Sequence, residues 1–532
     1  MTFNIKIYQR NLSNTSQLAF PGMSFEVERM AWTAQGGPDW ATVKVKHNWD
    51  AAQAALRQVD RNTVELLDVW EMLEILRCPV VITDEQDDLV WWGFVQGSMV
   101  QDQRVQVGVS LEKMTNKTRV VYSRVNVAGT VGERAQTDWV QDDLSISEYG
   151  TRQRQSTMNQ ANDEQAEARR DTLLERLKYP LVQRVFGEFG EPSAYLNLSG
   201  WFSSLDWLPY ENSSGKEGYE TIGDGLQAFG NAAGQAQVAQ SFQLAGAVSW
   251  AANVIRVRMK KEEAPVDTLT LRLRSDSAGA PGATLATATM NGADVSENLN
   301  WHEFTLSARV ALAASTTYWI SLERSGAADA VNYYKVDGNE DLGYTRGVFR
   351  IWNGSAWVAR SPDADMLFAV SGVAETSGQV DEIAVTAGQF FSDVSVQVNS
   401  GVYSSPYRDG DRSALAEIRD LLESGTTNGR RMLATVSMDR ELIVTEEPAP
   451  GGSSDYLVDN QAKMYDLGNN ELKAWRYPVG VWARLKGVVP SSVDTARLAD
   501  PTMVFVEDVI YDARTNKAAI RERDASRMLE VE

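Results

Sequence analysis

Alternation of hydrophobic and polar residues is most regular in the middle of the chain. In Ile255–Lys260 the apolar residues occupy every second position, and basic residues fill the positions between them. Leu269–Arg274 repeats this pattern, with leucines on one face. A period of two is what a β-strand with one buried and one solvent-facing side requires. A break at Glu262–Pro265 separates the two segments, so we expect two neighbouring strands.

Further short strands are expected along the same block, between breaks that are rich in glycine and proline. They are Trp301–Leu306, Thr317–Glu323, Asn332–Val336, Val348–Trp352 and Asp365–Val370. About seven short strands at this spacing are typical of an antiparallel β-sandwich. We therefore predict a β-sandwich over residues 240–372, inserted into a larger body that continues on both sides of it.

The chain before this insert is expected to be mainly β with short helices. Strand candidates are Phe3–Tyr8, Phe25–Trp32, Trp40–Lys46, Cys78–Thr83 and Leu89–Gln96, and helix candidates are Asp50–Gln58, Thr63–Arg77 and Asn159–Lys178. Thr130–Ser147 is polar and is expected to be a loop, and Gly225–Ala239 a linker. The aromatic residues of Gly200–Tyr210 are expected to form a hydrophobic plug where the insert joins the body, with a binding platform as the alternative. This organisation gives a β-domain over 1–125 and a connector over 126–239.

After the insert, residues 373–532 are expected to form an α+β domain. Val380–Ala387 is a strand candidate, whereas Asp411–Ser424 is expected to be a helix, because its apolar residues recur every three or four positions. Met432–Met438 and Glu441–Thr445 are expected to pair as a hairpin. The predicted fold class is therefore mainly β with a few helices, divided among several domains.

Charge and cysteine content limit the classes of partner. The formal net charge of −21 disfavours a protein that wraps nucleic acid, since phosphate neutralisation needs clustered lysine and arginine. It is compatible with a protein beside mobile DNA, which an acidic wall repels. Cys78 is the only cysteine, so disulfides within the chain and cysteine-rich zinc sites are excluded, and a buried inert thiol is expected. We expect no signal peptide and no membrane span, because no apolar run is long enough.

Residues suited to catalysis are few. His47 and His302 are the two histidines and lie in separate strand candidates, so serine-triad, cysteine–histidine and histidine-rich metal mechanisms lack components. No phosphate-binding loop or dinucleotide-binding glycine motif in its strand–helix context is present. A glycosidase-type carboxylate pair stays open among the 72 acidic residues, although no particular pair is indicated. We therefore predict a non-enzymatic protein without catalytic residues or a cofactor.

Aromatic residues late in the insert are the candidate ligand-binding residues. They are Tyr333, Tyr334, Tyr344, Trp352 and Trp357. Rings on a β-surface are suited to stacking on the faces of sugars, so a glycan site is one interpretation. Burial in the core of the sandwich is the other, and both stay open at this point.

Charged residues of the insert have simpler expected roles. Asp337, Asn339 and Asp341 alternate as in an oxygen-ligand calcium loop, but no bidentate glutamate follows at the required offset, so no metal is expected. Four outward-facing arginines are expected to pair with acidic residues of neighbouring strands, namely Arg256, Arg258, Arg272 and Arg274.

Short motifs outside the insert resemble those of tailed-bacteriophage tail hub proteins. Leu89–Val95 reads LVWWGFV and is followed by Val107–Leu111 and Asn116–Ser123, and in that family a W-G-x-V strand precedes a similar pair of segments. Ser147–Gly150 resembles the tyrosine–glycine pair that precedes a helix there. The C-terminal half resembles the family through Asp439–Val444 and Tyr477–Arg484. The insert separately resembles carbohydrate-binding jelly-roll modules through Ser241-Phe242, Pro281–Ala286 and Thr316–Ile320.

The resemblance implies a structural role in a virion. Hub proteins form trimers whose paired β-rich domains mimic a six-fold ring, join the tail tube to the tip and line the channel that passes DNA. It implies a homotrimer, with a hexamer as the alternative, together with tube, distal tail and tip or fibre proteins as partners. The location would be the tail tip or baseplate, after synthesis in the host cytoplasm. The inserted module would project outward and contact host-surface polysaccharide or brace a neighbouring tail protein.

Three alternatives differ from the hub in testable ways. A distal tail ring protein with an inserted sugar-binding module would assemble as six copies. A cell-wall or capsule glycosidase would cleave polysaccharide and lose activity when one acidic residue is replaced. A free glycan-binding adhesin would need a secretion signal.

Overall fold

The computed structural model describes most of the chain, in two compact units. The described residues are 2–10, 17–20, 23–47, 72–102, 104–125, 131–190, 193–221, 225–244, 250–339, 343–360, 364–449, 455–487 and 503–522. Unit 1 comprises Met1–Tyr210, Ser377–Val402 and Asp411–Glu532, and unit 2 comprises Glu211–Thr376 and Tyr403–Gly410. The predicted fold class is confirmed, since the chain is mainly β with a few helices and is divided into more than one domain.

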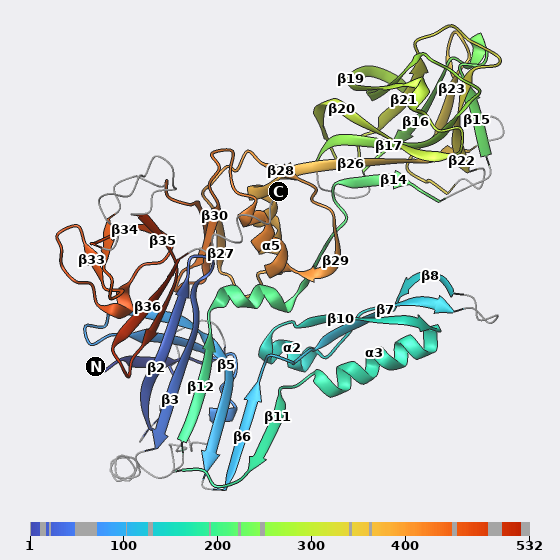
Figure 1. The fold of residues 1–532 in the computed structure, drawn as a ribbon. Helices are drawn as coiled ribbons and strands as arrows, with labels where there is room; N and C mark the ends of the chain where they lie inside the picture. Colours follow the sequence, from blue (N-terminus) through green and yellow to red (C-terminus); the bar gives the residue numbers. More distant parts are fainter. Residues whose placement is uncertain are drawn as a thin grey trace. The chain divides into compact units, whose positions relative to one another are not determined.

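Unit 1 is built around a thirteen-stranded sheet (Figure 1). Its strands are β1 (Asn4–Ile7), β2 (Met23–Thr33), β3 (Gly37–His47), β4 (Pro79–Thr83), β5 (Leu89–Asp102), β6 (Val105–Ser110), β11 (Leu181–Phe186), β12 (Ser193–Ser199), β32 (Tyr456–Val458), β33 (Met464–Asp466), β34 (Val481–Leu485), β35 (Met503–Asp512) and β36 (Lys517–Glu522). One run of antiparallel neighbours has the order β11-β6-β5-β12-β3-β2. β35 then pairs with residues 29–33 of β2, so segments from both ends of the sequence share one sheet.

The core of unit 1 lies against this sheet and includes the 3-10 segment η2 (Trp201–Trp207). Phe94 of β5 packs on Trp201 and Trp207, with ring centroids 4.9 and 5.5 Å apart. Trp201, Phe202 and Trp207 are all buried. The hydrophobic plug expected in this segment is therefore confirmed.

The remaining elements of unit 1 form two smaller sheets and several helices. One sheet contains β7 (Lys117–Val125), β8 (Val131–Gln136), β9 (Val140–Gln141) and β10 (Gln153–Ala161), and the other contains β27 (Asp393–Val396), β30 (Met432–Val436) and β31 (Glu441–Glu446). The helical segments are α2 (Asp143–Tyr149), α3 (Asp163–Leu177), α4 (Thr376–Ala387), α5 (Ala414–Glu423) and η5 (Ala474–Arg476). No helix in the described ranges is long and apolar enough to cross a bilayer.

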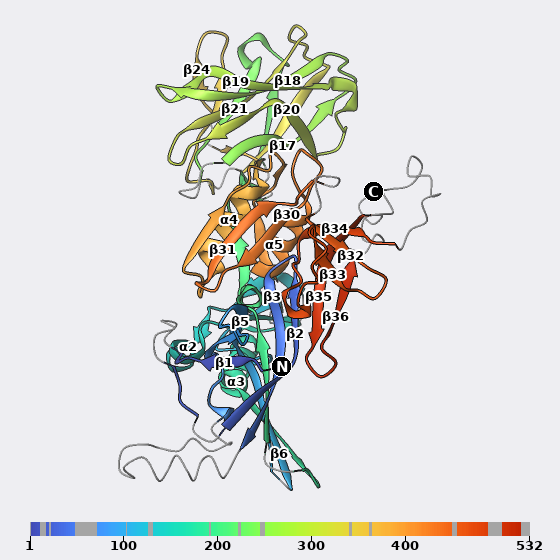
Figure 2. The ribbon, with the colours of Figure 1, turned by 90° about the vertical axis from the view of Figure 1, so that its left-hand side faces the viewer.

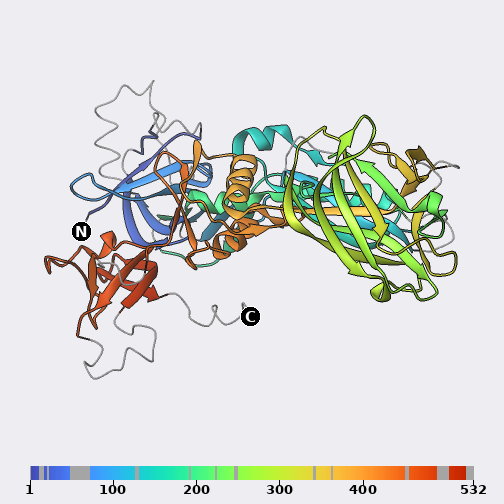
Figure 3. The same cartoon turned by 90° about the horizontal axis from the view of Figure 1, so that it is seen from above.

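Unit 2 is a β-sandwich (Figures 2 and 3). Its eight-stranded sheet contains β14 (Lys216–Tyr219), β15 (Gly225–Phe229), β17 (Trp250–Glu262), β20 (Asn300–Leu312), β22 (Tyr333–Asn339), β25 (Asp365–Met366), β26 (Phe368–Glu375) and β28 (Tyr403–Ser404). Its six-stranded sheet contains β16 (Gln237–Phe242), β18 (Thr268–Ser277), β19 (Ala280–Asn291), β21 (Tyr318–Arg324), β23 (Phe349–Trp352) and β24 (Trp357–Ala359). Short segments η3 (Ala233–Gln235) and η4 (Gly292–Asp294) also belong here, and the chain passes between the units within β13 (Pro209–Asn212) and β29 (Arg408–Ser413).

The apolar alternation predicted the core of the sandwich correctly. The apolar positions of the two most regular strands are fully buried: Ile255, Val257, Met259, Leu269, Leu271 and Leu273. Three of the four outward arginines pair with acidic residues, two of them with residues of neighbouring strands, as expected. Arg256 contacts Glu220, Arg258 contacts Asp337 and Arg272 contacts Glu323.

Several expected elements were wrong, and each error has a local reason. Val380–Ala387 lies in helix α4 because its buried residues, Val380, Ile383, Ala384 and Ala387, recur with helical spacing. Thr130–Ser147 is not a loop, since β8, β9 and the start of α2 fall within it. Gly225–Ala239 is not a linker but contains β15 and the first half of β16, whose backbones pair with β22 and β21.

Other expectations agree with the structure or lie outside its described part. The structure confirms the five strands expected before residue 97, which are β1 to β5. It also confirms the hairpin of Met432–Met438 with Glu441–Thr445 and the helices within Asn159–Lys178 and Asp411–Ser424. The helix expected over Asp50–Gln58 lies outside the described residues. The helix expected over Thr63–Arg77 falls within the described part only from residue 72, and residues 72–77 there form a short 3-10 segment and turns.

Gly93 allows β5 and β12 to approach closely. A Cβ atom at this position would lie 2.2 Å from the carbonyl oxygen of Ser199 and 2.6 Å from the ring of Trp91. Both distances are far below contact, and one of these neighbours is backbone, which has little room to move. Close packing between β5 and β12 therefore explains why glycine occupies position 93 of the LVWWGFV segment.

We expect Gly93→Ala to destabilise unit 1 by roughly 1–3 kcal/mol, because the added methyl group overpacks the β5–β12 contact. Gly108→Ala is the matched control in β6, since its Cβ would meet its nearest atom at 4.0 Å. Urea denaturation of the full chain measures both variants. Equal stability of the two variants would contradict this account.

Asp84 connects the β4–β5 turn to the C-terminal part of unit 1. Its carboxylate accepts hydrogen bonds from Arg476, from the indole N–H of Trp475 and from the backbone N–H of Gln86. Burial alone would raise the pKa of the Asp84 carboxyl, but these hydrogen bonds outweigh burial and lower the pKa to about 2. The ionised carboxylate therefore stabilises the folded state above about pH 4, and this contribution is lost as pH falls towards about 2.

Asp84→Asn is expected to lower the melting temperature at neutral pH, with a deficit that shrinks between about pH 4 and about pH 2. Asp88→Asn is the matched control, because Asp88 also pairs with Arg476 but its side chain is 57% exposed. Thermal unfolding across this pH range measures the difference. A deficit that does not change with pH would rule out the ionised carboxylate as its cause.

Candidate functional site

The five aromatic residues of the insert divide into core residues and surface residues. Tyr334 is 0% exposed and Tyr344 is 5% exposed. The hydroxyl of Tyr334 donates to Asp267 at 2.8 Å, and that of Tyr344 donates to Glu217 at 3.1 Å. These two tyrosines belong to the core of the sandwich, so they do not form a stacking surface.

Trp352 and Trp357 do form a surface pair. They lie directly opposite each other in the β23–β24 hairpin, at the edge of the six-stranded sheet, and both are half-buried. Their ring centroids are 5.6 Å apart in an edge-to-face arrangement. Tyr333 is also half-buried but belongs to β22 in the other sheet, beside Lys335. Of the predicted residues, the structure therefore brings only the two tryptophans together with exposed ring surface.

Arginines share the sheet face of the tryptophan pair. Side chains two residues apart on a strand point to the same face, so Arg350 lies on the face of Trp352. Strand register continues this face through Ala239 and Ser321 to Arg272. Arg274 follows two positions beyond Arg272. The Nε atoms of Arg274 and Arg350 are buried without a hydrogen-bond partner among the described residues.

Two of the three residues that alternate as in a calcium loop lie on a strand. Asp337 and Asn339 are buried on β22, and Asp337 forms an ion pair with Arg258 at 2.9 Å. Asp341 lies outside the described residues. Within the described ranges, no group of three histidine, cysteine or acidic side chains is arranged to hold a metal ion.

The cysteine and the described histidine side chain are buried in separate places. Cys78 is 4% exposed, and burial raises the pKa of its thiol, which disfavours the nucleophilic thiolate. His302 lies on β20, and burial lowers the pKa of its imidazole. His47 is the last residue of β3.

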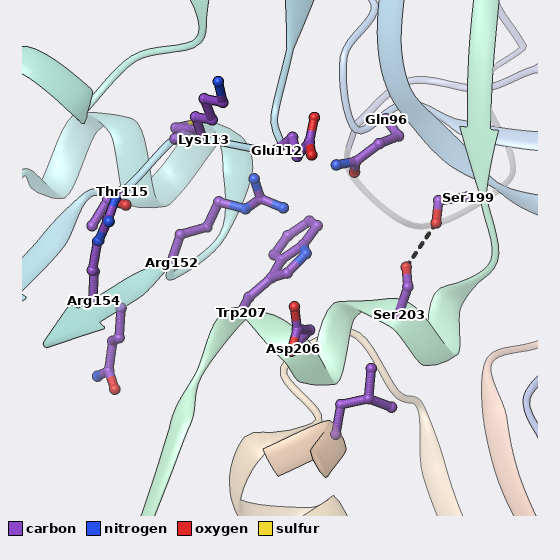
Figure 4. Close-up of a pocket in the computed structure, with 13 residues that line it drawn as sticks. Gln96, Glu112, Lys113, Thr115, Arg152, Arg154, Ser199, Ser203, Asp206 and Trp207 are labelled. Carbon is purple, nitrogen blue, oxygen red and sulfur yellow. Dashed lines mark hydrogen bonds between the residues drawn. The ribbon is translucent and has the colours of Figure 1, made fainter. Parts of the chain in front are cut away.

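A pocket in unit 1 holds a cluster of polar residues that sequence reasoning did not single out (Figure 4). Its volume is about 440 Å³. Its wall comes from β5, from residues 112–115, from the start of β10, from the end of β12 and from η2. The residues that matter for its chemistry are Gln96, Glu112, Lys113, Arg152, Arg154, Ser199, Ser203, Asp206 and Trp207.

Main-chain hydrogen bonds hold Arg152 in place in this pocket. The fully buried side chain of Asn116 accepts a hydrogen bond from the backbone N–H of Arg152 at 2.7 Å. The backbone N–H groups of Asn116 and Lys117 both donate to the carbonyl oxygen of Arg152 at 3.1 Å. Asn116 Nδ2 in turn donates to the carbonyl oxygen of Gly150 at 2.8 Å. The chain just before β10 is thus fixed on both sides of Arg152.

The guanidinium group of Arg152 is buried and only partly compensated. Arg152 is 5% exposed, and its guanidinium carbon lies 3.7 Å from the ring centroid of Trp207, a cation–π contact. Its Nε and Nη1 atoms have no hydrogen-bond partner in the described part of the chain. Burial lowers the pKa of Arg152 to about 9, and the nearby charge of Asp206 opposes this shift.

Sequence patterns gave little indication of this pocket. Trp207 was expected as part of the hydrophobic plug, but nothing in the local pattern distinguishes Arg152 from the other 50 lysine and arginine residues. Its burial follows from contacts with Trp207 of η2 and with Asn116, which are distant in sequence.

Comparison with known proteins gives no relative for this chain. No family model matches it, and no curated protein sequence matches it. Similarity to solved structures is weak. The isomalto-dextranase of Arthrobacter globiformis T6 is 13% identical over 31% of this chain and 28% of its own, with a TM-score of 0.15.

Two further solved structures show the same weak similarity. The mosquito-larvicidal Cry4Aa toxin of Bacillus thuringiensis is 8% identical, with 68% of this chain and 58% of its own covered and a TM-score of 0.16. A glycoside hydrolase family 43 arabinoxylan arabinofuranohydrolase from Bacillus subtilis is 10% identical, with 56% and 63% covered and a TM-score of 0.15. The chain thus spans less than two thirds of each of these proteins, and likeness at such TM-scores carries no argument about fold or function.

Proposed function

We propose that this protein is a structural component of a bacteriophage tail, a baseplate or tail-tip hub that joins the tail tube to the tip and lines the DNA channel. The segments that resemble hub proteins fall on successive elements of unit 1: Leu89–Val95 on β5, Val107–Leu111 on β6 and at its end, and Ser147–Gly150 at the end of α2. The net charge of −21 agrees with a channel wall that leaves DNA mobile.

The observation that carries this proposal is an exposed apolar strand at an open sheet edge. Among the described strands, β11 pairs only with β6 (Figure 1), and all residues of β11 are exposed. Phe186 is 79% exposed and Val185 is 52% exposed. No other strand in the described part of unit 1 covers the free edge of β11. An apolar edge strand in water is a template for pairing with another chain, so this edge is suited to assembly.

The other end of the same run of strands is open as well. β35 pairs with β2 only through residues 29–33, so the segment Met23–Val27 is paired on one side alone among the described strands. β11 of one copy can therefore pair with Met23–Val27 of the next copy by strand addition. Such a head-to-tail contact uses two different surfaces and closes into a ring when the rotation fits. The hub proposal expects three copies in this ring, and six copies would favour the distal tail ring protein.

We propose a second role for unit 2, contact with an anionic polysaccharide on the host surface. The Trp352–Trp357 pair offers rings for stacking on sugars, and Arg274 and Arg350 on the same face favour negatively charged ligands, whereas Arg272 is already paired with Glu323. Arginine Nε atoms without a partner at Arg274 and Arg350 support a charged ligand over a neutral one. Bracing of a neighbouring tail protein by this face is the alternative.

Phe186→Lys is expected to reduce the assembled fraction at least roughly tenfold, because it places a charge at the apolar edge contact. It should leave the melting temperature of the single chain unchanged, since Phe186 is 79% exposed there. Mass photometry and negative-stain averages of the full chain measure this. Val266→Lys is the control, because Val266 is 84% exposed but lies in unit 2. A ring that persists unchanged in Phe186→Lys would refute the role of β11.

Trp357→Ala is expected to weaken retention of the full chain on anionic host polysaccharide roughly tenfold, through loss of ring stacking. Tyr407→Ala is the matched control, because Tyr407 is a 43% exposed aromatic residue elsewhere in unit 2. Affinity electrophoresis in gels containing anionic or neutral polysaccharide separates the charge contribution from the stacking contribution. Absence of retention on every host extract, or equal retention of both variants, would contradict the glycan role.

A further inference from the structure

Arg152 lines the unit 1 pocket, and two nitrogens of its buried guanidinium have no acceptor among the described residues. Buried polar groups in proteins nearly always have hydrogen-bond partners, and each exception calls for a physical reason. Here Nε and Nη1 of Arg152 both lack a partner within the described ranges, although the residue is only 5% exposed. The face of the guanidinium is covered by Trp207, so the free N–H donors lie around its edge, next to the pocket.

A second polar group in the pocket also lacks a partner. Gln96 Oε1 is buried and accepts no hydrogen bond from any described residue. Gln96 is the extra residue of a β-bulge, because Gly97 is opposite Asn197 whereas Val95 is opposite Leu198. Bulges redirect a side chain and occur next to functional sites. Figure 4 shows Gln96 and Arg152 on the wall of the same pocket.

The Arg152 guanidinium and Gln96 Oε1, the two groups without a partner, require ligand atoms of opposite hydrogen-bonding type. Arg152 offers N–H donors at Nε and Nη1 to an anionic acceptor such as a carboxylate oxygen. Gln96 Oε1 needs a donor such as a hydroxyl group. A single small molecule that carries a carboxylate and a hydroxyl can satisfy both, and a volume of about 440 Å³ lies within the usual range for small-molecule pockets.

The charges of the pocket are mixed and leave a cationic excess. Lys113, Arg152 and Arg154 line it together with the carboxylates of Glu112 and Asp206. Asp206 already accepts a hydrogen bond from the hydroxyl of Ser413 at 2.7 Å. Neither carboxylate lies within ion-pair distance of Arg152 in the described structure, so the buried guanidinium keeps an unfilled anion position.

We propose that this pocket binds a small hydroxy acid, whose carboxylate accepts hydrogen bonds from Arg152 and whose hydroxyl group donates to Gln96. Sugar acids belong to this chemical class. Ser199 and Ser203, whose hydroxyls are hydrogen-bonded to each other at 2.8 Å, are placed to contact further hydroxyl groups of such a ligand. The site is independent of ring assembly and of the tryptophan face of unit 2.

Titration calorimetry and thermal unfolding of the full chain test this proposal with glucuronate as the probe. Glucose supplies hydroxyl groups without a carboxylate, acetate supplies a carboxylate without hydroxyl groups, and sulfate at equal ionic strength supplies a different oxyanion. We expect glucuronate to bind at one site per chain and to raise the melting temperature. Glucose, acetate and sulfate should bind at least roughly tenfold more weakly. Glucose has no carboxylate for Arg152, and acetate and sulfate have no hydroxyl donor for Gln96.

Substitutions then assign the site. Arg152→Met should weaken glucuronate binding roughly 10- to 100-fold, and Gln96→Leu should weaken it several-fold. Without ligand, Arg152→Met should be at least as stable as the wild type, because it removes a buried charge that lacks full compensation. Arg169→Met is the matched control, an exposed arginine of α3 that does not line the pocket, and should bind glucuronate within about twofold of the wild type.

Three results would overturn the proposal. They are absence of glucuronate binding to the wild type, unchanged binding by both Arg152→Met and Gln96→Leu, and equal or tighter binding of sulfate. Gln96→Leu keeps the test decisive if Arg152→Met fails to fold, because Gln96 makes no hydrogen bond through its Oε1 atom that folding would lose.

Discussion

The antiparallel pairing of β2 with β35 is the constraint on which the rest of unit 1 depends. It joins residues 29–33 to residues 508–512, so the body is complete only when both ends of the chain are present. The segment in between must leave and return, and this requirement allows a second compact unit to occupy residues 211–376 and 403–410. Long-range pairing of this kind is costly in chain entropy and needs strong additional contacts.

Buried ionic contacts supply some of those contacts between distant segments. Arg431 lies just before β30, within 3.1 Å of the carboxylate oxygens of three glutamates. They are Glu423 of α5, Glu447 directly after the β30–β31 hairpin, and Glu507 of β35. Burial alone would lower the pKa of Arg431, but these carboxylates outweigh it and raise the pKa. Asp84 and Arg476 make a similar connection between the N-terminal hairpin and the C-terminal segment. Such pairs favour one register over others, because misplacement would leave a charge buried alone.

Sequence patterns predicted local elements well and long-range arrangement poorly. The strict alternation of Ile255–Lys260 and Leu269–Arg274 fixed which side chains enter the sandwich core, because the period of two has no helical interpretation. Val380–Ala387 was wrongly predicted to be a strand, because a short apolar stretch fits a strand or a helix equally well. Tyr334 and Tyr344 could not be separated from Trp352 and Trp357 by sequence, since all are aromatic residues in strand-rich context and only packing decides which are covered. The burial of Arg152 could not be predicted for the same reason, because it comes from contacts with Trp207 and Asn116 rather than with neighbours in sequence.

Cross-linking tests most directly whether copies of this chain join through β11 and the Met23–Val27 half of β2. Cys78 is buried and is the only cysteine, so the variant Gln183→Cys with Ser24→Cys carries two exposed reactive thiols in an otherwise unreactive chain. Treatment of the purified protein with a short bismaleimide should yield covalent dimers and trimers and nothing larger, and neither single variant should yield trimers. Failure of the double variant to cross-link between chains, under conditions in which both thiols react with a monofunctional maleimide, would contradict the account.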